Sequence, residues 1–264
     1  MRKTTLIATS LAALSAPIIT TASFAEDGDE EGYVSEPVVY SQRRLVMAPG
    51  LIRPELSLFV AGFGDDTAVG FGVEIDWTPI DKLQIGAVAS PRLSPSTYAG
   101  DPMLYARYLL LEGGAQIAVQ AGYTFTDPSP GMLHLGVPLR FAINPASRID
   151  ITPLLTIDLP PSGGETEFGL SLPVSLGVSL TRAIYLDLTS GIDIPDFDFE
   201  RSSIPLGLEV GYSLKGGEES AFIDLFLSVS FANFVRPSAP EGTDSASLDF
   251  WKVAIGGRGH FGLE

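Results

Sequence analysis

The sequence predicts an all-β protein, a closed antiparallel transmembrane β-barrel of about 12 strands. Three observations lead to this prediction: strand-like alternation between an apolar face and a small, weakly polar face, an even number of such segments, and connections that are alternately short and long. The clearest alternation is in residues 168–180, FGLSLPVSLGVSL, where every second residue is large and apolar. A period of two is the side-chain period of a β-strand. The small second face is typical of a strand that separates lipid from a lumen.

Twelve such segments follow one another without a helical pattern. Most have the roughly 9–11 residues that a tilted strand needs to cross the hydrocarbon layer, and closed bacterial barrels have even strand numbers. We expect the strands near residues 55–63, 67–77, 82–90, 103–112, 115–126, 132–142, 149–158, 168–180, 184–192, 204–214, 220–233 and 248–261.

The connections between these segments differ in length according to the end of the barrel on which they would lie. Short links at 78–81, 113–114, 143–148, 181–183 and 215–219 alternate with mostly longer ones at 91–102, 127–131, 159–167, 193–203 and 234–247. Outer-membrane barrels have short periplasmic turns and longer external loops. We therefore place both barrel termini on the periplasmic side; the short external link 64–66 is the exception.

Residues 1–25 read as a secretory signal peptide, with Arg2 and Lys3 before an apolar run and a small-residue cleavage site at Ala25. The chain has no cysteine, which excludes disulfides, thiolate nucleophiles and cysteine metal sites. Removing Arg2 and Lys3 takes the net charge from −16 to −18, and so negative a protein should repel nucleic acid. Charged residues make up only 18% of the chain, which disfavours a soluble secreted β-sandwich.

Residues 26–54 are expected to form an acidic, flexible N-terminal extension and lead-in, before a barrel domain at 55–264. The stretch 26–37, EDGDEEGYVSEP, has no basic residue and little apolar surface to bury. The lead-in at 38–54 contains Arg43, Arg44 and two prolines, Pro49 and Pro54. A solvated tail is the favoured interpretation of this lead-in, and a short plug that enters the lumen is the alternative.

The alternation assigns individual side chains to a face. Aromatic residues near the strand ends are expected to form the girdles of a membrane barrel: Trp77, Phe125, Phe141, Phe168, Tyr212, Phe231 and Phe261. Charged residues expected to face the lumen are the acids Glu55, Glu74, Asp76, Asp150, Asp158, Asp187, Glu209 and Asp224 and the bases Lys82, Arg107, Arg140, Lys252 and Arg258. Eight acids against five bases predict a weak cation preference for an open lumen.

The sequence gives little support for an enzymatic site or a metal site. The two histidines, His134 and His260, are expected to face inward, but neither has the neighbours that a hydrolytic triad needs. We therefore predict no catalytic residues and no cofactor. Asp196, Asp198 and Glu200 gather in an expected external loop and are a weak candidate for a cation site. A solvated loop is the favoured interpretation.

The signal peptide, the FGLSLPVSLGVSL-type strands and the final strand LDFWKVAIGGRGHF resemble those of porin-like bacterial outer-membrane β-barrel proteins. The resemblance implies an outer-membrane location, with lipid, lipopolysaccharide and the barrel-assembly machinery as partners. In that group the chain usually ends at an aromatic residue, whereas here Gly262, Leu263 and Glu264 follow Phe261. Four prolines fall inside expected strands and indicate either bulges or errors of register: Pro138, Pro153, Pro173 and Pro205.

These observations leave three hypotheses for function. The first is a non-enzymatic passive pore for ions or small solutes with a weak cation preference. The second is a barrel closed by its N-terminal segment or by side chains, which acts as a structural or adhesion protein through its external loops. The third, a soluble secreted β-sandwich with a binding role, is the least favoured.

Overall fold

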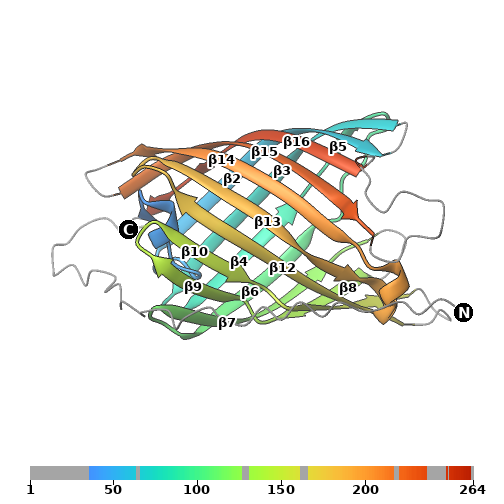
Figure 1. Ribbon diagram of the computed structural model, residues 1–264, viewed down its shortest axis with the longest axis horizontal. Helices are drawn as coiled ribbons and strands as arrows, with labels where there is room; N and C mark the ends of the chain where they lie inside the picture. Colours follow the sequence, from blue (N-terminus) through green and yellow to red (C-terminus); the bar gives the residue numbers. More distant parts are fainter. Residues whose placement is uncertain are drawn as a thin grey trace, which may run out of the picture.

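The computed structural model describes residues 36–63, 66–126, 131–160, 166–216, 220–236, 248 and 250–262. In this part of the chain, seventeen strand segments join edge to edge in one sheet that closes on itself (Figure 1). None of the helices described there is long and apolar enough to cross a membrane. The predicted signal peptide, residues 1–25, and the acidic residues up to 35 lie outside the described residues.

The strand segments form the twelve antiparallel strands that the sequence predicts. Four of these strands are interrupted and so appear as two segments each. The first strand begins at Leu51, four residues before the predicted start at residue 55. In chain order the barrel strands are β2 (Leu51–Phe63), β3 (Asp66–Ile80), β4 (Leu83–Ala89) with β5 (Arg92–Ser94), β6 (Met103–Leu111), β7 (Ala115–Thr124), β8 (Gly131–Gly136) with β9 (Leu139–Asn144), β10 (Ser147–Ile151) with β11 (Leu154–Leu159), β12 (Glu167–Ser179), β13 (Ile184–Ile194), β14 (Ile204–Lys215), β15 (Ser220–Val235) and β16 (Phe250–Gly259) with β17 (Phe261–Gly262).

The barrel is closed by pairing between its first and last strands. β16 runs antiparallel to β2 from Phe250 opposite Phe63 to Arg258 opposite Glu55. Lipid offers no hydrogen-bond partners, so a sheet can cross a membrane only if it has no free edge. The pairing of β16 with β2 removes that edge and satisfies the requirement.

The two faces of the sheet differ as the alternation predicts. On β2, Leu56 and Leu58 are 61% and 59% exposed on the outer wall, whereas the inward Ser57 and Ala61 are 7% and 3% exposed. The same contrast on the other strands gives the barrel an apolar outer band around a polar interior. A closed barrel with such a band fits a bacterial outer membrane.

The end of the barrel that has the short turns also holds residues 36–50, which we call the inserted segment. It consists of β1 (Glu36–Pro37), the 3₁₀ helix η1 (Tyr40–Gln42) and an irregular stretch that leads into β2 (blue in Figure 1). Val38, Val46 and Met47 are each no more than 3% exposed. The favoured interpretation of this lead-in as a solvated tail is therefore wrong, and the plug alternative describes residues 36–50.

The prolines that conflicted with a regular ladder mark irregularities in the sheet. Pro138 separates β8 from β9, and Pro153 separates β10 from β11. The irregularities are neighbours, because the Val137 amide donates to the Pro153 carbonyl (3.0 Å) and the Thr152 amide to the Pro173 carbonyl (3.0 Å). Pro205 lies at a register shift between β14 and β15. At Pro138 and Pro153 the register continues without an inserted residue, since Gly136 pairs with Leu154 and Leu139 pairs with Ile151, so the two faces are kept.

The opposite faces of β12 can be tested by adjacent arginine substitutions. We expect Val174→Arg to block membrane assembly, since an arginine on the lipid face near the bilayer midplane costs roughly 2–4 kcal/mol. Ser175→Arg should be much milder because Ser175 lines the lumen cavity. Heat-dependent gel mobility of the outer-membrane fraction measures the folded yield, and equal losses from both substitutions would contradict the assignment of faces.

Candidate functional site in the barrel lumen

The inserted segment crosses the short-turn end of the lumen and is fixed to the wall at both of its ends. Glu36 and Pro37 pair antiparallel with Ala221 and Ser220 at the start of β15. At the other end, the Gly50 amide donates to the Thr78 carbonyl of β3 (2.8 Å). Gly50 has a φ of 80°, a left-handed value that favours glycine and turns the chain into β2.

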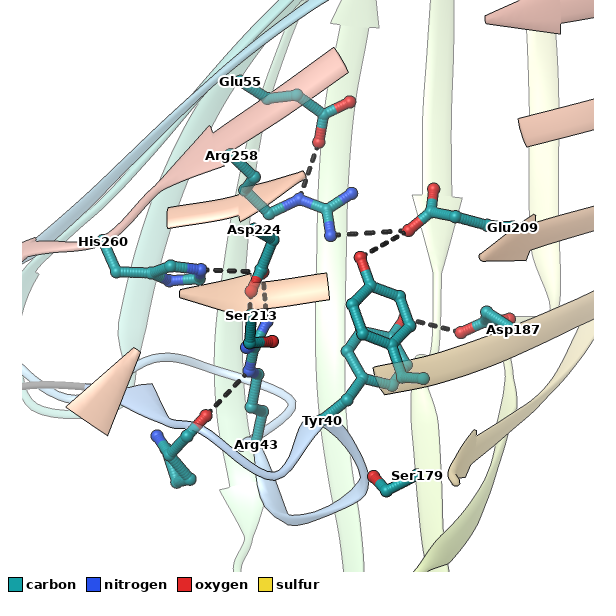
Figure 2. A network of polar contacts seen from close by, with 12 residues as sticks. Tyr40, Arg43, Glu55, Ser179, Asp187, Glu209, Ser213, Asp224, Arg258 and His260 are labelled. Carbon is teal, nitrogen blue, oxygen red and sulfur yellow. Dashed lines mark hydrogen bonds and ion pairs between the residues drawn. The ribbon is translucent and has the colours of Figure 1, made fainter. Parts of the chain in front are cut away.

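Arg43 is the first of two side-chain anchors. Its guanidinium donates to both carboxylate oxygens of Asp224, with Nη2 2.8 Å from Oδ1, and Nη2 also donates to the Ser213 hydroxyl (3.0 Å). His260 completes the cluster, with Nε2 2.9 Å from Asp224 Oδ2. The side chains of Arg43 and Asp224 are 5% and 0% exposed, so this is a buried, bidentate ion pair (Figure 2).

Tyr40 is the second anchor. Its ring stacks on Tyr185 of β13, with centroids 4.0 Å apart, and its hydroxyl donates to Asp187 (2.5 Å). The guanidinium of Arg148, a residue of β10, lies 4.1 Å from the centroid of the Tyr40 ring and makes a cation–π contact with it. Burial raises the pKa of the Tyr40 phenol above its ordinary value, so the hydroxyl keeps the proton that it donates to Asp187. Figure 2 shows the Tyr40 and Arg43 side chains extending from one loop of the segment to different parts of the wall.

The segment forms part of the lining of a cavity of about 370 Å³ in the lumen. Tyr40, Arg43, Arg44 and Leu45 contribute from the segment, and the remainder comes from the inner faces of the barrel strands. Among the described residues that line it, seven are arginines and five are carboxylates: Arg43, Arg44, Arg53, Arg107, Arg140, Arg148 and Arg258, and Glu55, Glu74, Asp150, Asp187 and Glu209.

Most of these charges are paired across neighbouring strands. Arg258 Nε donates to Glu55 (2.7 Å), and its Nη1 lies 3.7 Å from Glu209. Arg140 makes a bidentate pair with Asp150 on β10 (2.6 and 2.7 Å). Bidentate arginine–carboxylate pairs are strong and geometrically specific. The lumen wall at this level is consequently a rigid network rather than a set of free charges.

The structure brings together most of the charged residues predicted to face the lumen. Eight of them line the cavity, and Asp76 and Asp224 are buried beside it in pairs with Arg53 and Arg43. Lys252 lies apart, with Nζ 4.7 Å from the Phe59 ring centroid, and lines a second hollow of about 550 Å³ nearer the long loops. Lys82 is in the β3–β4 turn, and Asp158 is on β11 opposite Glu167.

Sequence reasoning missed four arginines of the cavity lining: Arg43, Arg44, Arg53 and Arg148. Two of them could have been found by extending the alternation, since Arg53 and Arg148 stand two residues before the inward-facing Glu55 and Asp150. Arg43 and Arg44 belong to the inserted segment, which has no strand period. The eight-to-five excess of acids that predicted a cation preference therefore does not describe this cavity.

The other predicted sites are distributed over the surface and the loops. Six of the seven girdle aromatics are between 38% and 47% exposed, and Phe231 is half-buried; their interfacial role stays a prediction. In the loop predicted to be external, Asp196 pairs with Arg201, and Asp198 accepts a hydrogen bond from the Glu200 amide (2.9 Å). The described residues contain no group of three acidic or histidine side chains that could hold a metal ion. His134 Nε2 lies 2.8 Å from the Thr124 hydroxyl.

Comparison with solved structures identifies the architecture. The NanC porin superposes with a TM-score of 0.62 at 8% identity, covering 80% of this chain and 100% of the porin. The chain has the fold of an outer-membrane porin. A second porin, KdgM in complex with disordered oligogalacturonate, gives a TM-score of 0.58 at 7% identity, covering 79% of this chain and 99% of that one. No protein-family model matches the sequence, and no curated protein matches it either.

Two adjacent arginines allow a controlled test of the Arg43 anchor. We expect Arg43→Ala to lower the free energy of unfolding by about 3–5 kcal/mol, because it leaves the buried Asp224 carboxylate without its partner. Arg44→Ala should cost no more than about 1 kcal/mol, since Arg44 and Glu112 are 40% and 37% exposed. Urea unfolding of the refolded barrel in detergent measures both values, and equal losses would contradict the role given to Arg43.

Proposed function

We propose that this protein is a non-enzymatic outer-membrane pore for ions or small solutes, narrowed at its periplasmic mouth by the inserted segment. The observation that carries the proposal is the polar cavity that a closed barrel encloses along its axis. A pore needs wall side chains that are small or hydrated, whereas a merely structural barrel can fill its interior with apolar ones.

The side chains of the cavity wall are mostly small or hydrated, as a pore requires. Besides its charges it presents the small residues Ser175, Thr189, Gly207, Ser228 and Ser230, and few apolar side chains. Small side chains leave space that large ones would fill, and the hydroxyl groups can replace part of the hydration of a passing ion. The porin fold supports the same function at the level of architecture.

The predicted cation preference takes a more specific form. Counted together with the buried Asp76 and Asp224 beside the cavity, seven carboxylates face seven arginines while the inserted segment is in place, so we propose little or no preference for cations. Removing the charges of Arg43 and Arg44 leaves five arginines against these seven carboxylates and frees Asp224 from its partner. We propose that the lumen shows a weak cation preference when the charges of Arg43 and Arg44 are absent.

A barrel closed by its N-terminal segment, acting through its external loops, is the second candidate. The burial of residues 36–50 at the periplasmic mouth favours it directly. In that case the protein would conduct no ions in any state, and the loops would carry the function. Lipopolysaccharide contacts and recognition by the barrel-assembly machinery remain part of the proposal for both candidates.

Ion selectivity in a planar bilayer tests the pore and its charge balance. Across a KCl gradient we expect the full chain to show a reversal potential near zero. The double variant Arg43→Gln/Arg44→Gln should shift this potential toward that of a cation-selective pore. The shift should fade as the salt concentration rises, because the Debye length falls from about 10 Å at 0.1 M to about 3 Å at 1 M.

Arg182→Gln is the matched control, because Arg182 is exposed in the turn between β12 and β13 and should leave the reversal potential unchanged. A shift of the double variant toward anions would contradict the charge assignment. The absence of conductance from every variant would favour the closed barrel.

A further inference from the structure

We infer that the periplasmic end of the lumen is a binding site for a peptide, and that residues 36–50 are its tethered occupant and partly close the mouth. The binding site stands on the contacts described below. The closing role rests in addition on the proposed function as a pore.

The first observation is that side chains of the wall contact the backbone of the segment. Three arginines on three strands donate through Nη1 to its carbonyl oxygens: Arg148 to Tyr40, Arg140 to Arg43 (2.7 Å) and Arg107 to Leu45 (3.1 Å). Three further wall side chains accept from its amides: Ser179 from Ser41 (3.1 Å), Gln116 from Leu45 (2.6 Å) and Gln84 from Met47 (3.4 Å). Buried backbone groups require such partners.

Without a bound peptide, the wall side chains that make these contacts would be buried without these hydrogen-bond partners. Gln84 and Gln116 are each 1% exposed, and Arg148 is 4% exposed. A buried polar side chain that loses its partner is costly. The six wall residues come from six strands that pair in succession, β4, β6, β7, β9, β10 and β12, so they line one continuous arc of the barrel wall. Their arrangement therefore complements a peptide backbone rather than an empty passage.

The second observation is a set of side-chain subsites that defines the kind of peptide. The Tyr40 ring occupies the site between Tyr185 and Arg148, and the Arg43 guanidinium occupies the site at Asp224. Leu45 and Val46 pack with Leu109 and Ala118 of the wall. The ligand is thus a peptide with an aromatic residue, an arginine three positions later across a 3₁₀ turn, and two apolar residues shortly after it.

The third observation is the path of the segment around the mouth. It contacts β15 at Glu36, β12 and β13 at Tyr40 and Ser41, and β3 at Gly50. The segment is held by non-covalent contacts along this path and by its covalent link to β2 at Leu51. A peptide that touches the wall on these separate sides lies across the opening and obstructs it.

A cysteine reporter in the full chain measures occupancy of the site without any need for conductance. The protein has no native cysteine, so Ser179→Cys introduces a single thiol next to Ser41, whose hydroxyl oxygen lies 3.0 Å from that of Ser179. We expect this thiol to react slowly with a charged methanethiosulfonate reagent, and at least tenfold faster when Tyr40→Ala and Arg43→Ala remove both anchors. Thr181→Cys, in the exposed β12–β13 turn, is the control and should react at the same rate in both backgrounds.

A synthetic peptide tests recognition in trans. Adding EPVVYSQRRLVMAPG, the sequence of residues 36–50, to the anchor-free reporter protein should slow its labelling again, whereas a scrambled peptide should not. Heat-dependent gel mobility establishes that each variant is folded. If an anchor variant fails to fold, single Tyr40→Phe and Arg43→Lys substitutions replace it, with at least a threefold increase in labelling rate expected for Arg43→Lys, which loses the bidentate contact.

The outcomes separate the binding site from the pore. Equal labelling of the Ser179→Cys thiol with and without the anchors, or equal effects of the two peptides, would overturn the peptide site. Faster labelling of anchor-free protein with an unchanged, non-zero conductance would overturn the closing role. Faster labelling with protection by the native peptide, in a protein that never conducts, would support the peptide site and overturn the proposed pore instead.

Discussion

The structure depends on one constraint, which is that no backbone hydrogen-bonding group can be left unpaired in lipid. The pairing of β16 with β2 meets this constraint and closes the sheet. Because β2 is paired on both sides from near its start, the chain that precedes Leu51 must leave it at the rim of the barrel. Closure thus fixes the position of the inserted segment at the mouth as well as the geometry of the wall.

The same closure explains the charges of the lumen. Twelve strands enclose an interior in which arginines and carboxylates from distant parts of the chain meet, as Arg258 meets Glu55 and Arg43 meets Asp224. Ions in so confined a space are screened less than at an open surface, so complementary pairs form and free charges are few. The segment contributes two arginines to a wall that otherwise has five arginines and, with the buried Asp76 and Asp224, seven carboxylates. The position of the segment is therefore coupled to the charge of the lumen.

The strands, their facing and the alternation of loop lengths could be predicted from the sequence because each follows from local patterns of period two. Leu56, Ser57 and Val174 lie on the faces that the pattern assigns. Irregularities at Pro138 and Pro153 could be anticipated, but it could not be predicted that they would align across neighbouring strands and leave the register unchanged. The inserted segment could be offered only as the less favoured alternative, because Tyr40 and Arg43 acquire partners at Asp187 and Asp224, more than a hundred residues away, only in the closed barrel.

The most direct measurement uses a removable covalent anchor. In the Tyr40→Ala/Arg43→Ala background, Ser41→Cys and Ser179→Cys can form a disulfide, because the native hydroxyl oxygens lie 3.0 Å apart. The account predicts that the oxidised protein conducts weakly in a planar bilayer and that reduction raises the conductance of the same channels. An identical non-zero conductance before and after reduction would contradict the claim that residues 36–50 partly close the pore.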